Sequence, residues 1–334
     1  MQNKVKSQRF IWIDTMLTLI TLTVMEYFYY GLRAVVLSGI CVAVSLAAEI
    51  ISLRLMRRSF TADDLTCISD SLILFLMLPS ILDYKIAAIV CVFSVAIAKN
   101  IFGGRRNMIF SPAAVGYVFL LTSWNGNAML YSSPHTYTGV FEKADNLVNS
   151  VSYVFNTTGR MDYTDFELIM GSVPGAVGTL SILLLAVSAV ILFFRRDISA
   201  GAFIGAMVGT VVPALLVPVC NDWFESMKYT LSTNMVLFSA IYIVADKRIA
   251  PRRNYYAFFY GFFIAAFSYV LVLTTAKENA IVIVSVLFAP AAIGFRNLES
   301  HIDGLVKEEK QAVELWNAIK SGEIEISEEA SDNE

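Results

Sequence analysis

Charged and metal-binding side chains are scarce in this sequence. Only 16% of its residues are charged, whereas an average soluble protein has roughly 25%. Its two histidines, His135 and His301, fall outside the apolar segments, so no histidine metal site is expected within a membrane. No nucleotide-binding loop or nucleophile motif occurs, and nothing indicates a nucleic acid partner. We therefore assign no catalytic residue and do not expect the chain to act alone as a hydrolase.

Cysteine is also rare, and its spacing carries no motif. The four cysteines, Cys41, Cys67, Cys91 and Cys220, include no C-x-x-C pair. We expect them to be small apolar filling residues. A metal or cluster shared with another subunit is the alternative, and we predict no metal site within this chain.

Long apolar runs dominate what is present, with 57% of the residues hydrophobic. A helix needs roughly 20 apolar residues to cross a hydrocarbon core of about 30 Å, so the runs predict an all-α polytopic membrane protein with about ten membrane-spanning helices. The predicted segments are 10–29, 33–53, 68–83, 84–101, 109–124, 176–194, 198–219, 231–245, 255–274 and 279–295.

The third and fourth of these segments are open to two interpretations. The run from Ser71 to Leu78 is short and ends at Pro79, so a pair of shortened or re-entrant helices fits as well as two full spans. Either version returns the chain to the same side of the membrane, so the rest of the topology is unaffected.

The positions of lysine and arginine predict the orientation. If the N-terminus is cytoplasmic, most basic residues fall in cytoplasmic turns, with Lys99 at one such turn and Arg33 among the few in outer loops. We therefore expect both termini to be cytoplasmic. Residues 1–30 lack the small-residue cleavage pattern of a signal peptide, so we do not expect cleavage there.

Two domains follow from this topology. Residues 1–296 form the transmembrane domain, with an outer loop at about 125–170, and residues 297–334 form a cytoplasmic tail. In the tail, Leu305, Val313, Trp316 and Ile319 recur at near-helical spacing, which predicts a partly amphipathic helix on the membrane surface or on a partner. Residues 321–334 are acidic and predicted to be disordered.

Ionisable residues within the apolar segments are candidates for an ion path, because burying a charge in lipid costs several kcal/mol. Glu49 and Asp70 fit that role and a purely structural role equally well. Asp246 could cap its span, pair with a neighbouring arginine or belong to the path. No second deep group appears that could pair with Glu49. Asp14, Glu26 and Lys247 are expected to be interfacial groups.

Four stretches carry a more specific pattern. They read ISDSLILFLMLPS at 68–80, AKNIFGGRRNMIFSPAAVGY at 98–117, LIMGSVPGAVGTLS at 168–181 and IVADKRIAPRRNYYAFFYG at 243–261. In order and context they resemble the RnfD and NqrB family, the related membrane subunits of the Rnf and Nqr complexes. The resemblance covers roughly residues 10–296.

This resemblance implies a ten-helix subunit of an ion-translocating electron-transport complex in the bacterial cytoplasmic (inner) membrane. Such a subunit carries FMN and riboflavin and works with other membrane and flavoprotein subunits. Electrons pass between flavins and iron–sulfur centres while Na⁺ or H⁺ crosses the membrane, and the cofactors supply the redox chemistry.

The flavin motifs of the family are altered here. The family attaches FMN to the threonine of D-x-x-[ST]-[GA]-A-T, whereas residues 145–159 read DNLVNSVSYVFNTTG. Ser152 is the nearest hydroxyl by spacing, and Ser150 and Thr157 are the other choices. An ordinary polar loop without flavin is the alternative.

The cytoplasmic-side flavin stretch also differs. The family's riboflavin-associated N-P-F-N-P-A corresponds to MIFSPA at 108–113. The resemblance therefore points to Asn107, Phe110 and Ser111 as cofactor-binding candidates. Asp246 is retained from the family's A-T-D-P.

Three functions remain compatible with these residues. The first is a flavin-linked electron-transfer subunit of an ion-translocating complex, with Asp246, Asp70 and Glu49 in the ion path. The second is a channel or transporter for a small solute, since a fold does not fix a function. The third is a cofactor-free scaffold subunit of a redox complex.

Overall fold

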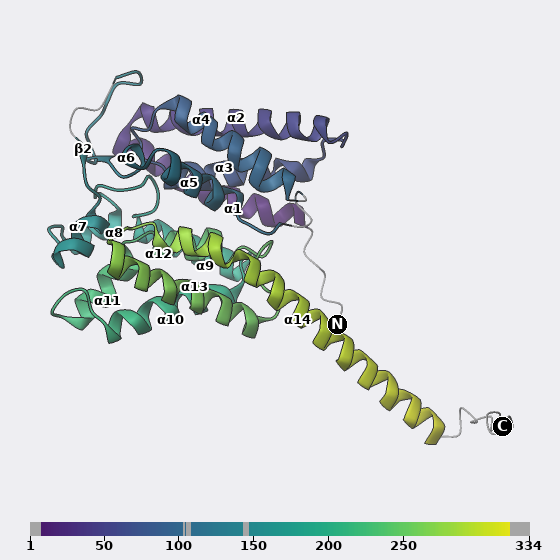
Figure 1. Cartoon of the computed structure of the whole chain (residues 1–334). Helices are drawn as coiled ribbons and strands as arrows, with labels where there is room; N and C mark the ends of the chain where they lie inside the picture. Colours follow the sequence, from purple (N-terminus) through teal and green to yellow (C-terminus); the bar gives the residue numbers. More distant parts are fainter. Residues whose placement is uncertain (1–7, 103, 105–107, 143–146, 321–334) are drawn as a thin grey trace.

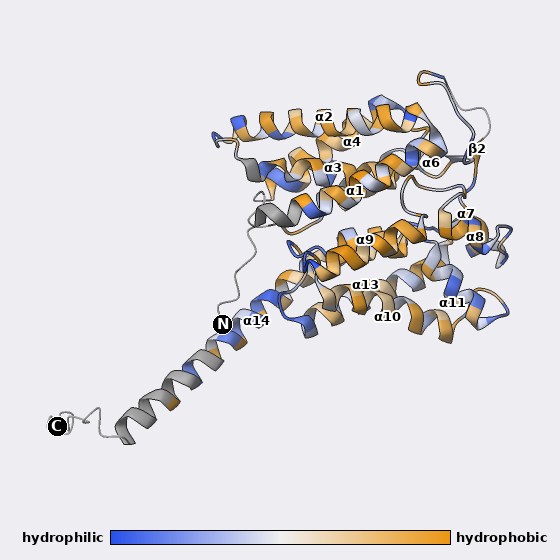
Figure 2. Cartoon of the chain, turned by 180° about the vertical axis from the view of Figure 1, so that it is seen from behind, coloured by the Kyte–Doolittle hydropathy of each residue, from blue (hydrophilic) through white to orange (hydrophobic). Residues whose placement is uncertain are grey.

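The computed structural model describes residues 8–102, 104, 108–142 and 147–320, and the chain is predominantly helical over these residues. Two groups of helices lie side by side, α1 to α5 in one and α9 to α14 in the other, and a segment with short helices covers one end of both (Figure 1). Apolar residues dominate the helices of both groups, and hydrophilic residues gather near helix ends and in the connections (Figure 2).

The first group contains α1 (Gln8–Tyr30), α2 (Leu32–Leu55), the 3₁₀ turn η1 (Ala62–Leu65), α3 (Thr66–Met77), α4 (Tyr84–Val92), the π-helix η2 (Phe93–Ile101) and α5 (Pro112–Ser123). The covering segment contains α6 (Asn125–Ala128), the paired strands β1 (Tyr131–Ser132) and β2 (Leu147–Val148), α7 (Val151–Thr158) and α8 (Asp165–Met170). The second group contains α9 (Ile182–Phe194), α10 (Ala200–Leu216), α11 (Trp223–Ser232), α12 (Val236–Ser239), the π-helix η4 (Ala240–Val244), α13 (Asn254–Thr275) and α14 (Ala280–Lys320).

The helices confirm a polytopic α-helical membrane protein. In the described residues, four helices are long and apolar enough to cross a membrane: α2, α4 with η2, α13, and the part of α14 up to Leu305. Shorter apolar helices, α3, α5, α9 and α10, lie among them. Every predicted segment contains helix, while the number of crossings stays a prediction.

The segment predicted at 68–83 is only a short helix. α3 has 12 residues, so it is about 18 Å long, well below the thickness of a hydrocarbon core. Apart from Ile68, all its residues are buried. The chain is extended at Leu78, whose carbonyl accepts a hydrogen bond from the Val177 amide at 3.2 Å. Such backbone is tolerated at membrane depth because protein surrounds it.

The second group contains a comparable buried element. All residues of η4 are buried, and the chain leaves the helix at Ala245. The Ala245 carbonyl accepts a hydrogen bond from the Ser199 amide at 2.8 Å. A short helical segment that is buried almost throughout thus lies within each group.

The covering segment, predicted as a loop at 125–170, is an ordered cap. Ser150 begins α7 by accepting a hydrogen bond from the Tyr153 amide, and Thr164 and Glu167 form a capping box at α8. Asn156 bonds Asn234 of the second group.

Arg33 connects this cap to the first group. It was expected in an outer loop, but it is buried and donates hydrogen bonds to the carbonyls of Ser80, Ile81, Gly139 and Glu142. The guanidinium therefore joins the chain after α3 to the covering segment.

Three glycines bring α10 and α13 into backbone contact. A Cβ on Gly201, Gly205 or Gly209 would overlap the carbonyl oxygens of Asn254, Phe258 and Phe262, respectively. Small residues at such spacing allow close helix packing in membranes.

We predict that Gly205→Ala destabilises the protein by about 1–3 kcal/mol, because the added methyl group forces α10 away from the α13 backbone. Thermal unfolding in detergent measures the effect. Gly39→Ala in α2 is the matched control, since a Cβ there meets nothing within 4 Å. If Gly205→Ala and Gly39→Ala had the same melting temperature, the packing argument would be contradicted.

Candidate functional site

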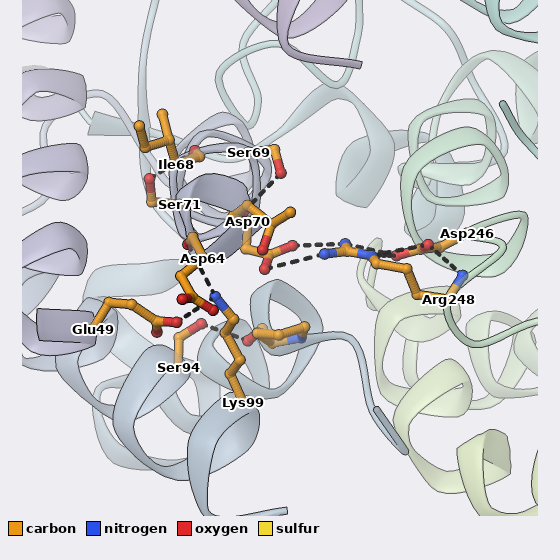
Figure 3. A network of polar contacts seen from close by, with 12 residues as sticks. Glu49, Asp64, Ile68, Ser69, Asp70, Ser71, Ser94, Lys99, Asp246 and Arg248 are labelled. Atoms are coloured by element: carbon orange, nitrogen blue, oxygen red, sulfur yellow. Dashed lines mark hydrogen bonds and ion pairs between the residues drawn. The ribbon is translucent and has the colours of Figure 1, made fainter. Parts of the chain in front are cut away.

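A buried ion pair joins α2 and η2. The Lys99 ammonium lies 2.8 Å from Oε1 of Glu49, and each side chain is 1% exposed (Figure 3). The neighbouring Asn100 donates to Oε2 of Glu49 at 2.9 Å, so both carboxylate oxygens have a partner. Lys99 also reaches the Asp64 carbonyl, at 3.4 Å.

This pair corrects two expectations from the sequence. Lys99 lies within η2 and is buried rather than facing water at a turn, and Glu49 does have a buried partner. Lys99 and Asn100 are consecutive residues of the π-helix η2, and both bond the Glu49 carboxylate. π-helices are found frequently at functional sites. The sequence does contain a signal for this pair, since Lys99 and Asn100 stand together at the end of an apolar run. Counting charges alone assigns such residues to the surface.

A second cluster joins the two helical groups. Arg248, which follows η4, lies 2.7 Å from Oδ1 of Asp70 in α3 and 2.7 Å from Oδ2 of Asp246 (Figure 3). Asp70 is fully buried, while Arg248 and Asp246 are partly exposed. The Arg248 amide also donates to Asp246. The pairing of Asp246 with a neighbouring arginine, one of the three sequence-based options, is confirmed, and the structure brings Asp70 into the same cluster.

The charges of the two clusters differ. Glu49 and Lys99 neutralise each other, whereas Asp70 and Asp246 share Arg248, and the Arg296 guanidinium lies beside them and donates to the Arg248 carbonyl at 2.7 Å. Ion pairs taken out of water lose several kcal/mol of hydration per ion, which only well-formed contacts recover. The second cluster therefore holds two carboxylates on one guanidinium, either of which can bind a proton or a small cation at the junction of the two groups.

The other ionisable residues of the spans divide between surface and interior. Lys247 is exposed, as an interfacial group should be, whereas Asp14 is buried and pairs with the exposed Arg195 at 3.0 Å. Glu26 is only 4% exposed and receives a hydrogen bond from the Gly178 amide. The expectation of an interfacial Glu26 is therefore wrong.

The candidate attachment residues Ser150 and Ser152 lie beside a buried carboxyl. Ser150 caps α7, and the Ser152 hydroxyl accepts a hydrogen bond from the Asn234 amide at 3.1 Å. Both hydroxyls and that of Tyr131 also bond the Glu278 carboxyl. Burial raises the pKa of Glu278 above its ordinary value, although these three hydrogen bonds oppose the shift.

This geometry does not fit a flavin attached to either serine. A phosphoester needs the serine Oγ as its bridging atom, so the oxygen must face open space. Each serine is 1% exposed, and both hydroxyls are engaged inside the cap. Thr157 is exposed, with its hydroxyl bonded to the carbonyls of Tyr153 and Val154.

The cytoplasmic-side candidates are only partly described. Asn107 lies outside the described residues. Phe110 packs edge-on against Phe102, with the ring centroids 5.5 Å apart, and Ser111 is buried where α5 begins. Close by, the Ser94 hydroxyl of η2 bonds the Pro112 carbonyl at 2.7 Å, so this bend adjoins the helix that carries Lys99.

A family model described as the NQR2, RnfD, RnfE family matches residues 1–295. The chain belongs to this family. The resemblance noted from the sequence is thereby confirmed.

Similar curated proteins are subunits of ion-translocating complexes. One belongs to the Na⁺-translocating ferredoxin:NAD⁺ oxidoreductase complex of Acetobacterium woodii and is 28% identical over 176 residues, which are 52% of this chain and 53% of the relative. Another belongs to the Na⁺-translocating NADH-quinone reductase of Yersinia pestis and is 26% identical over 203 residues, or 57% of this chain and 48% of the relative. A third, from the ion-translocating oxidoreductase complex of Shewanella amazonensis, is 24% identical over 140 residues, which are 41% of this chain and 39% of the relative. The chain therefore spans about half the length of these relatives, or less.

We predict that Lys99→Met destabilises the protein by about 3–5 kcal/mol, because it leaves the Glu49 carboxylate buried without a cation. Adding Glu49→Gln should recover much of this loss, since no buried charge remains. Thermal unfolding of the single and double variants in detergent measures both effects. Lys228→Met is the control, because its pair with Asp165 is exposed and worth about 0–1 kcal/mol. Equal destabilisation by both lysine variants would refute the assignment.

We predict that residues 125–170 carry no FMN on Ser150 or Ser152, because both hydroxyls are enclosed. Mass spectrometry of these peptides, from protein purified out of its own membrane, measures this directly. An FMN mass on either serine would show that the cap opens before modification.

Proposed function

We propose that this chain is a membrane subunit of an ion-translocating electron-transport complex, as its relatives are named. The observation that carries the proposal is the cluster of Asp70, Arg248 and Asp246 between the two helical groups. Membrane proteins rarely bury such groups, and those that do use them mostly on ion pathways. In this proposal Asp246, Asp70 and Glu49 belong to the ion path.

Two carboxylates that share one guanidinium give this cluster its function. Arg248 has donors for both carboxylates at once, so a cation or proton that neutralises one carboxylate leaves the other held. Asp246 is the more accessible of the two and is therefore the entry group, while Asp70 lies deeper, in α3. Glu49 is the third carboxylate of the path, and its pair with Lys99 also holds η2 against α2.

The same proposal includes a topology of ten spans with both termini cytoplasmic, in the bacterial cytoplasmic membrane. Two observations support it. In the topology predicted from the sequence, most lysines and arginines fall on one side of the membrane. In the structure, α1 begins and α14 leaves the bundle at the same end (Figure 1). The body then covers residues 1–296, and residues 297–334 form the tail.

The partners in this proposal are other membrane subunits and flavoproteins that carry the electrons. Ser150 and Ser152 do not fit a bound flavin, so we assign no electron-transfer step to them. FMN or riboflavin, where present, would sit elsewhere, and the bend at Phe110 and Ser111 is the remaining candidate on this chain.

We predict that Asp246→Asn abolishes ion uptake driven by electron transfer, because the substitution removes the more accessible of the two carboxylates in the cluster. The measurement is Na⁺ uptake and internal pH in inverted native membrane vesicles, energised with NADH or with reduced ferredoxin and NAD⁺. Glu49→Gln should impair the same uptake, and Asp246→Glu should retain part of it.

The matched control is Asp165→Asn, which removes an aspartate from an exposed pair in the cap. It should leave uptake unchanged. Normal ion uptake in both Asp246→Asn and Glu49→Gln would sink the ion-path proposal.

A further inference from the structure

Glu26 is a buried carboxyl that is paired with no cation in the described structure. Its Oε1 accepts a hydrogen bond from the Gly178 amide at 2.6 Å, and its Oε2 has no partner among the described residues. The side chain is 4% exposed. Glu49, Asp70 and Asp246 instead each have a cationic nitrogen within 2.8 Å.

The surroundings of Glu26 are neutral. A cavity of about 10 Å³ adjoins the carboxyl, lined also by Tyr29, Tyr30, Gly171, Val173, Ala176, Gly178, Leu180 and Ser181. It has room for about one water molecule. Apart from Glu26, the titratable groups among these lining residues are the two tyrosines. Beyond Tyr29 lies the exposed His135, whose ring centroid is 5.4 Å from that of the tyrosine.

A charged carboxylate is costly in such a place, since an ion without a partner in a low-dielectric interior binds a proton and becomes neutral. The cavity also offers a metal cation few ligands. Glu26 is the one carboxylate among its lining residues, and one of the Glu26 oxygens already accepts the Gly178 amide.

Gly178 fixes the position of the amide. Its φ angle is +75°, which favours glycine, and a Cβ there would overlap Leu76 in α3. The amide therefore reaches Glu26 only because the chain presses against the end of α3. Asp70 lies on the same short helix, six residues before Leu76, or about 9 Å along the axis. α1 itself packs against α3.

We propose that Glu26 is a proton-binding site at the outer end of α3, protonated in the resting protein, which exchanges its proton with water in the adjacent cavity. To become the neutral acid, the carboxylate takes one proton from a hydronium ion that enters the cavity from solvent, which leaves a neutral water, and it returns the proton to water by the same route. Its further role, as the outer station of the path that begins at Asp246 and Asp70, rests on the proposed function.

Infrared difference spectroscopy of the purified protein in lipid tests the protonation state. At neutral pH, the wild-type-minus-Glu26→Gln spectrum should contain the carbonyl stretch of a protonated carboxylic acid, and the band should shift in D₂O. The matched control, Glu49→Gln, makes the same chemical change at an ion-paired carboxylate and should remove only carboxylate bands. A Glu26→Gln difference spectrum that shows carboxylate bands and no acid band would overturn the proposal.

Native vesicles test the role in the path. Glu26→Gln should abolish ion uptake while electron transfer continues, and Glu26→Asp should restore part of the uptake. If the acid band belongs to Glu26 but uptake is normal in Glu26→Gln, the outer-station role is wrong. If wild-type vesicles show no electron-driven uptake at all, the proposed function fails, whereas the infrared result on Glu26 stands on its own.

Discussion

The guanidinium of Arg248 holds Asp70 in α3 and Asp246 beyond η4, and this shared contact fixes how the two helical groups meet. Asp70 lies within the short, buried α3, and Asp246 follows the buried η4, so protein surrounds the backbone near both carboxylates. A hydrophobic replacement would pack more simply, but it would provide no place for a cation.

Much of the architecture follows from local sequence. Apolar runs of sufficient length predict helices, and every predicted segment contains one, because a chain in lipid must satisfy its backbone groups internally. The sequence left open whether 68–83 and 84–101 form two spans or a pair of shortened helices. α3 is short, as the proline after Leu78 indicated, whereas α4 with η2 is long enough to cross a membrane. The ordered cap with α7 and α8 was not foreseen, since its stability comes from contacts such as Asn156 with Asn234, far apart in the sequence.

Pairing of buried charges is the part that sequence reasoning missed. Lys99 and Arg33 lie near the ends of apolar segments, where charge counting assigns them to water. Whether such a residue turns outward or inward depends on a partner contributed by another helix, as Glu49 is for Lys99. The same applies to Glu26, whose only donor among the described residues is the amide of Gly178, distant in sequence. Asp246 was easier, because its arginine is two residues away.

The length of α14 determines how far it extends beyond the membrane body. It is a single helix of 41 residues, hence about 60 Å long, and its apolar run ends at Phe295, before Arg296, Glu299 and Asp303. The turns from Arg296 to Lys320 extend about 38 Å past that point, which exceeds the diameter of a small folded domain. A partner that binds the end of this helix can thus lie away from the lipid headgroups. The helix then acts as a rigid spacer between the membrane body and that partner.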